Sequence, residues 1–213
     1  MGSMSIFLPF FLCLPVFFAA EKIELFNGVN MDGWLGPNNQ PARCTVANRE
    51  MFCSSGVGDI HTKATHSSAH IHLEFQIPAM PEQKGQRKGN SGVYLQGRYE
   101  IQILDSWENP TYANGSLGAL YGQTAPLLNA ARKPLEWQAY DIIFHATACD
   151  TAGVVTKKAT VTVLLNGELV QDHVTIEKAA DCTAGPLLLQ DHSGFKDAPK
   201  TTMKFRNLWL RPL

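Results

Sequence analysis

Apolar side chains in this chain recur at every second position, in short runs separated by turn residues. Between Ile71 and Ile77 apolar residues alternate with polar ones, which is the pattern of a half-buried β-strand. The segment 161–170 carries two apolar runs around an Asn-Gly pair, and Asn-Gly supplies the two positive φ angles of a type I′ hairpin turn. No long stretch follows the 3.6-residue period of an amphipathic helix.

Similar runs occur along most of the chain. We expect further strands at 23–26, 91–95, 99–104, 138–145, 187–190 and 204–210. Many short antiparallel strands with turns between them are typical of a β-sandwich or barrel. The chain has 213 residues, the length of one domain, and shows no internal repeat or linker. The sequence therefore predicts a single all-β domain over residues 21–213.

The charge balance argues against one class of partner. Lys and Arg number 18 and Asp and Glu 19, a net charge of -1 at pH 7. No excess of positive charge is available to neutralise phosphates, so we expect no nucleic acid partner. The sequence also lacks a glycine-rich phosphate loop and a Cys-x-x-Cys pair, which argues against nucleotide cofactors and structural zinc.

The first 20 residues are predicted to be a separate leader. Residues 6–20 carry no charge and include Pro9 and Pro15. The run is shorter than the ~20 residues that a membrane-spanning helix needs. Its length is typical of the apolar region of a secretory signal peptide, with cleavage near Ala19 or Ala20. A buried N-terminal strand is the alternative. We expect a secreted or periplasmic protein with no membrane contact after cleavage.

Four cysteines remain beyond the leader. The segment 44–53 is predicted to be a hairpin, which would place Cys44 and Cys53 opposite each other and close enough for a disulfide. Cys149 and Cys182 are then the remaining pair. Four cysteines allow three connectivities, and four buried free thiols are the alternative. Disulfides would agree with an exported protein.

The segment 91–107 carries the candidate chemistry. Two predicted strands flank a tight loop, and a loop of odd length would pair Tyr94 with Glu100. A two-residue loop would instead put the carboxylate among apolar side chains, so the hydrophobic pattern selects the first register. Tyr94, Glu100 and Gln102 then share one face. A glutamate in mid-strand is costly unless that face is wet or functional. An ordinary solvent face is the alternative.

Other polar residues are expected to continue this face. They are Asp141 and His145 on one predicted strand, and Gln190 and His192 after another. Such a face is polar without being rich in lysine and glutamate, which favours a sugar-binding cleft. The connection 105–136 follows directly, and structureless connections longer than ~12–15 residues are usually functional.

Hydrolysis by two carboxylates is one alternative. Glu-x-Gln-x-x-Asp at positions 100–105 is similar to the Glu-x-Asp-x-x-Glu strand of laminarinase-type glucanases, with Gln102 in place of the central Asp. Five residues of strand separate the Cα atoms of Glu100 and Asp105 by ~16 Å, and odd spacing turns the side chains to opposite faces. A retaining pair needs carboxyl groups ~5 Å apart, so a bulge would be required.

Several blocks of sequence, in order, carry a resemblance to a known family. They lie at 25–28 with 33–34, 58–63, 89–106, 119–123, 136–144, 185–192 and 206–211. Through these blocks the chain from about residue 23 to its end resembles the 3-keto-disaccharide hydrolase family. The resemblance implies a concanavalin-A-like antiparallel β-sandwich, a jelly roll, and a carbohydrate as the partner.

The resemblance also implies a reaction. A base removes the C2 proton of a sugar already oxidised at C3, the enolate expels the C1 substituent, and water can then add. One base and one oxyanion stabiliser suffice for this elimination. The base would be Glu100, or alternatively Asp105. His192, His145 or Lys63 would stabilise the enolate or protonate the leaving oxygen.

The remaining site residues follow from the same resemblance. We expect sugar binding by Tyr94, Arg98, Gln102, Trp107, Tyr121 and Gln190, with Asp141, His145 and Lys63 as further candidates. A divalent metal could stabilise the enolate instead, held by residues among Glu100, Asp141, His145, Asp191 and His192, although no ligand spacing requires one. A non-catalytic, lectin-like module on the same fold is the other alternative.

Overall fold

A computed structural model describes residues 20–193 and 200–213. The predicted leader at residues 1–20 lies outside the described residues, apart from Ala20. No helix in the described segments is long and apolar enough to cross a membrane. Those segments hold three short 3₁₀ helices, η1 (Pro37–Asn39), η2 (Gly85–Arg87) and η3 (Ala113–Gly115). The all-β prediction is confirmed.

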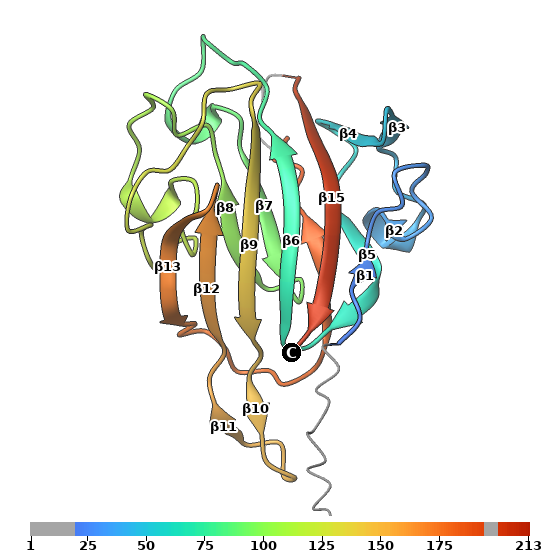
Figure 1. Cartoon of the computed structure of the whole chain (residues 1–213), viewed down its shortest axis with the longest axis vertical. Helices are drawn as coiled ribbons and strands as arrows, with labels where there is room; N and C mark the ends of the chain where they lie inside the picture. Colours follow the sequence, from blue (N-terminus) through green and yellow to red (C-terminus); the bar gives the residue numbers. More distant parts are fainter. Residues whose placement is uncertain (1–19, 194–199) are drawn as a thin grey trace, which may run out of the picture.

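Two antiparallel sheets form the two layers of a sandwich (Figure 1). The larger sheet has eight strands, in the order β13 (Glu168–Thr175), β12 (Thr160–Leu165), β9 (Trp137–His145), β6 (Ala69–Gln76), β15 (Thr202–Pro212), β4 (Glu50–Ser54) and β3 (Thr45–Ala47), with β1 (Ile23–Glu24) paired to β15. The smaller sheet has five, in the order β2 (Trp34–Leu35), β5 (Ile60–His66), β14 (Gly185–Leu189), β7 (Ser91–Leu95) and β8 (Tyr99–Ile103). A separate ribbon pairs β10 (Ala148–Cys149) with β11 (Val155–Lys157).

The core lies between the two sheets. Ile71, Leu73 and Phe75 of β6 are fully buried, as are Val93 of β7 and Ile101 of β8. Their neighbours along each strand point outward, as the alternation in the sequence predicts. Every second residue of β6 is buried, so the period-two pattern is confirmed where it is clearest.

The predicted register of the β7–β8 hairpin is confirmed. Tyr94 pairs with Glu100 and Val93 pairs with Ile101. The loop between the strands uses positive φ angles at Gln96 and Gly97. Because the loop is three residues long, the apolar residues of both strands face the core together and Glu100 faces outward.

Both predicted disulfides are present. Cys44 is bonded to Cys53, with 4.5 Å between Cα atoms, at the hairpin formed by β3 and β4. Cys149 is bonded to Cys182, 33 residues later, with 6.0 Å between Cα atoms. The second bond ties the β10–β11 ribbon to the segment that leads into β14.

The structure corrects one prediction about the polar face. Asp141 and His145 belong to β9 of the larger sheet, whereas Glu100 belongs to the smaller one. His70 Nε2 and His72 Nδ1 lie 3.0 and 2.9 Å from the same oxygen of Asp141. Asp141 and His145 therefore lie on the opposite outer surface of the sandwich. The alternation of polar and apolar residues predicts that both side chains point outward, but it does not predict which sheet their strand joins.

Candidate functional site

Glu100 is the centre of a hydrogen-bonded row across the smaller sheet. The hydroxyl of Tyr94 donates to Glu100 Oε2 at 2.9 Å. Gln190 Nε2, just after β14, donates to the Tyr94 hydroxyl at 3.0 Å. Gly92 on β7 leaves room for the carboxylate, because a Cβ at that position would overlap Glu100 Oε1. The glycine therefore lets the glutamate lie close against the sheet surface.

The surroundings of Glu100 make it more basic than an exposed glutamate. Burial raises the pKa of Glu100 to about 6, the hydrogen bond from Tyr94 opposes this rise, and the negative charge of Asp59 adds to it. Burial also raises the pKa of Tyr94, which keeps its phenol protonated and able to donate. A carboxylate that is ionised at neutral pH yet has a raised pKa has the properties of a general base.

Asp59 acts on this site but is not among the site residues that the sequence predicts. Asp59 Oδ1 accepts the backbone N–H of Asp191 at 2.8 Å. The carboxylate of Asp191 accepts the backbone N–H groups of Gly56 and Gly58 at 2.8 and 2.7 Å. Asp191 therefore holds the turn before β5 against the end of β14. The sequence feature that could have indicated Asp59 is its position in the block 58–63, directly before the strand β5.

His192 and Lys63 are the predicted electrophilic groups that lie with the smaller sheet. Burial lowers the pKa of His192, although the carboxylates of Asp191 and Asp59 act in the opposite direction, so the imidazole is neutral at pH 7. Lys63 is exposed on β5, which is separated from β7 by β14. His145 is on the other sheet and cannot reach a substrate bound at Glu100.

A hollow of about 500 Å³ opens beside Glu100. Its walls come from the β7–β8 hairpin, from the long connection after β8 and from the segment before β14. The lining residues are Tyr94, Arg98, Tyr99, Glu100, Leu120, Tyr121, Gly122, Gln123, Ile176, Glu177, Lys178, Ala180 and Asp181. Of the predicted sugar-binding residues, Tyr94, Arg98 and Tyr121 therefore meet here.

The long connection at 105–136 supplies part of this wall. The backbone N–H of Tyr121 donates to the carbonyl of Glu100 at 3.0 Å, and the N–H of Gln102 donates to the carbonyl of Ala119 at 3.0 Å. The segment thus runs along β8, which is the edge strand of its sheet. The Tyr121 hydroxyl lies 2.7 Å from that of Tyr112. The connection is ordered by these bonds and places Tyr121 next to the candidate base.

Three predicted site residues on β8 and directly after it lie outside the hollow. Asp105 is 2% exposed and forms an ion pair with Lys88 at 3.1 Å, so its carboxylate is enclosed by protein. Gln102 is also buried, and its amide donates to the carbonyl of Gly115. Trp107 is half-buried with the ammonium of Lys133 over its ring. The folded connection covers the part of the β8 face that the sequence pattern predicts to be open.

The candidate metal ligands do not converge. No group of three or more His, Cys, Asp or Glu side chains in residues 20–193 and 200–213 is arranged to hold a metal ion. Asp141 and His145 lie on the larger sheet, whereas Glu100, Asp191 and His192 lie at the smaller one.

The chain is thus an antiparallel β-sandwich in which a carboxylate with a raised pKa borders a hollow on one outer face. Residues 21–211 match the family described as the 3-keto-alpha-glucoside-1,2-lyase-like domain. The chain belongs to this family, as its sequence blocks predicted. It is a glycosyl hydrolase-like, carbohydrate-active protein.

Solved structures support the assignment. A crystal structure of a protein from Parabacteroides distasonis ATCC 8503, provisionally named a glycosyl hydrolase, is 38% identical, with a TM-score of 0.83 over 90% of this chain and 84% of that one. A second such protein from the same organism is 20% identical, with a TM-score of 0.66 over 90% of this chain and 94% of that one, and shows the shared fold. An alginate lyase at 10% identity and TM-score 0.54, covering 92% and 97% of the two chains, shows the shared fold alone. No curated protein matches the sequence.

Proposed function

We propose that the protein is an exported enzyme that cleaves 3-keto-glycosides, with Glu100 as the base that removes the C2 proton. The observation that supports this most is a mid-strand carboxylate with a pKa of about 6, hydrogen-bonded to a tyrosine and bordering a hollow of about 500 Å³. The family assignment supports the keto-sugar substrate. The apolar leader and the two disulfides support export.

The reaction is an elimination across C1 and C2. The Glu100 carboxylate takes the C2 proton, and the electron pair left behind is delocalised onto the C3 oxygen as an enolate. That pair then forms the C1=C2 double bond, while the C1–O bond breaks and its electrons leave on the departing oxygen. The departing oxygen takes a proton from the Glu100 carboxylic acid or from water and becomes an alcohol. Addition of water across C1=C2 gives net hydrolysis.

Other residues would support the reaction. Gln190 Nε2 donates to the Tyr94 hydroxyl at 3.0 Å and so would hold Tyr94 in place. Lys63, exposed on β5, would stabilise the negative charge on the enolate oxygen, and His192 is the alternative. Tyr94 keeps the Glu100 carboxylate oriented through its hydroxyl.

The test is the turnover of matched oxidised and unoxidised glucosides, followed by release of the alcohol. We expect release from the 3-keto-glucoside only. Glu100→Gln should lower that rate by roughly 10²- to 10⁴-fold, the usual contribution of a positioned base. Glu74→Gln is the matched control, because Glu74 is a strand glutamate on the larger sheet and should not affect turnover.

Each other outcome identifies a different error. Unchanged turnover in Glu100→Gln would exclude Glu100 as the base. Release from the unoxidised glucoside would indicate a laminarinase-type hydrolase. Binding without release from either glucoside would indicate a lectin-like module.

A further inference from the structure

Glu100 has neighbours of two different kinds on its two sides. Toward the middle of the smaller sheet lie the Tyr94 hydroxyl and the amide of Gln190, and the negative charge of Asp59 acts on Glu100 as well. Beyond the edge of the sheet lies the hollow. A sugar ring with free hydroxyls suits the polar side. Once C2 is at Glu100 and the ring lies on that side, the group on the adjacent C1 is directed to the hollow.

Several polar side chains of the hollow are bonded within the protein, although Lys178 is exposed. Gln123 Nε2 donates to the carbonyl of Thr175 at 2.8 Å, and Gln123 Oε1 accepts the backbone N–H of Glu177 at 2.9 Å. The carboxylate of Glu177 is paired with Lys158 at 2.6 Å. The amide of Gln123 therefore connects two walls of the hollow and has little capacity left for a ligand.

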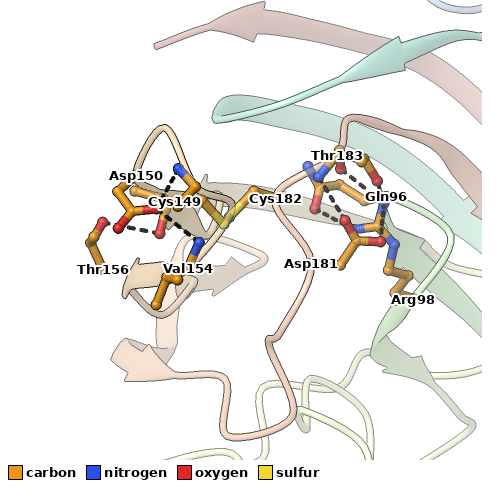
Figure 2. The surroundings of a disulfide bond; sticks show 11 residues. Gln96, Arg98, Cys149, Asp150, Val154, Thr156, Asp181, Cys182 and Thr183 are labelled. Atoms are coloured by element: carbon orange, nitrogen blue, oxygen red, sulfur yellow. Dashed lines mark hydrogen bonds and ion pairs between the residues drawn. A yellow bond between two sulfur atoms is a disulfide. The ribbon is translucent and has the colours of Figure 1, made fainter.

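Arg98 is occupied in the same way. Its guanidinium donates to the carbonyl and hydroxyl of Thr183 at 2.8 and 2.9 Å and lies 3.5 Å from the carboxylate of Asp181. Figure 2 shows these contacts next to Cys182, whose disulfide to Cys149 anchors the segment. Because its charge is balanced by Asp181, Arg98 serves to hold the wall rather than to attract an anion.

The lining that remains is mainly apolar. Leu120 and Ile176 close the hollow with side chains that are 3% and 2% exposed. Tyr99 also belongs to the lining, although it is buried. Tyr121 is 42% exposed, and since its hydroxyl lies 2.7 Å from that of Tyr112, what it offers a ligand is the face of its ring. An exposed aromatic ring beside aliphatic side chains suits a flat, apolar group.

We propose that this hollow is the binding site for the leaving group of the substrate, and that it selects an aromatic aglycone over a second sugar. The inference rests on the proposed function. A volume of about 500 Å³ is ordinary for a small-molecule site. A sugar leaving group would bring several hydroxyls beside the apolar part of this lining, where Gln123 and Arg98 are already bonded within the protein, and burying hydroxyls without partners is unfavourable.

The test compares three ligands that share the 3-keto-glucosyl ring. They are the phenyl glycoside, the methyl glycoside and a disaccharide whose leaving group is glucose. Binding to Glu100→Gln is measured by titration calorimetry, so that no ligand is consumed. We expect the phenyl glycoside to bind roughly ten- to a hundredfold more tightly than the methyl glycoside, the effect of burying a phenyl ring. The disaccharide should bind no more tightly than the methyl glycoside.

Two further variants locate the effect. Tyr121→Ala should reduce the preference for phenyl over methyl several-fold. Leu127→Ala is the control, because Leu127 is an exposed apolar residue outside the hollow, and it should keep the preference. If Glu100→Gln does not fold, the KM values of the three substrates with the unaltered protein provide the same comparison.

The outcomes separate this inference from the proposed function. Equal affinities for phenyl and methyl glycosides, a tighter disaccharide, or a preference that Tyr121→Ala leaves unchanged would overturn the aglycone site alone. Failure of all three 3-keto ligands to bind would contradict the proposed function, and the inference with it.

Discussion

Replacing Glu100 by glutamine should make the protein more stable at pH 8, although it removes the proposed base. The pKa of Glu100 is raised from 4.5 to about 6, mainly by burial. When folding raises the pKa of a carboxyl group, the ionised form of that group destabilises the folded protein. That cost is fully present above pH ~6, where the folded protein must hold the charge, and is absent below pH ~4.5, where both states are protonated.

The size of the effect follows from the shift. A rise from 4.5 to about 6 corresponds to about 2 kcal/mol at 1.36 kcal/mol per pKa unit. Glu100 is only partly buried, so solvent screening reduces this to about 1 kcal/mol. For a domain of this size, 1 kcal/mol changes the melting temperature by about 2–4 °C. We expect Glu100→Gln to melt about 2–4 °C higher than the unaltered protein at pH 8.

Thermal unfolding at pH 8 and at pH 4.5 is the assay, with Glu74→Gln as the opposite control. Partial burial acts to raise the pKa of Glu74, but hydrogen bonds from Asn207 and Arg206 lower it overall. Glu74 therefore contributes stability above its unfolded pKa that is lost as the pH falls through the folded value, and its replacement should lower the melting temperature at pH 8. The reasoning would be refuted if Glu100→Gln melted lower at pH 8, or showed the same gain at both pH values.

Two further predictions concern catalysis. Serine substitution of both Cys149 and Cys182 should raise KM several-fold with less effect on kcat. It should also lower the free energy of unfolding by about 3–4 kcal/mol, because the disulfide closes a loop of 33 residues. Serine substitution of Cys44 and Cys53 in the β3–β4 hairpin should leave KM unchanged. Equal effects of the two disulfides on KM would contradict a role of the Cys149–Cys182 bond in shaping the hollow. In the pH profile of kcat/KM, the acid limb should fall near pH 6. Tyr94→Phe removes a hydrogen bond that lowers the pKa of Glu100 and should move that limb to higher pH, and movement to lower pH would show that Glu100 is not the group observed.

Local patterns were sufficient to predict the parts of the structure that depend on neighbouring residues. The register of β7 and β8 follows from keeping Val93 and Ile101 on one face, because a slip by one residue would have buried Glu100. The Cys44–Cys53 bond follows from the same argument, since opposed residues of a hairpin lie within disulfide distance. In both cases the close spacing of the two residues within one hairpin favours the pairing that is observed.

Properties set by the packing of distant segments could not be predicted in this way. Period two shows that Asp141 faces outward but does not show which sheet carries it. The burial of Asp105 and Gln102 depends on where the long connection folds. The influence of Asp59 on Glu100 acts through space between residues 41 positions apart in the sequence, and no spacing rule for strands relates them.

The backbone bonds between β8 and the segment 118–121 also bear on solubility and on evolution. An uncovered edge strand can pair with the edge of another molecule and start aggregation. Here the bonds from Tyr121 to Glu100 and between Ala119 and Gln102 occupy that edge. The segment 118–121 thus guards against self-association, and its residues Leu120 and Tyr121 also line the hollow. Relatives with altered leaving-group preference should accordingly vary in the flanking parts of the connection, while a backbone lining the edge is retained.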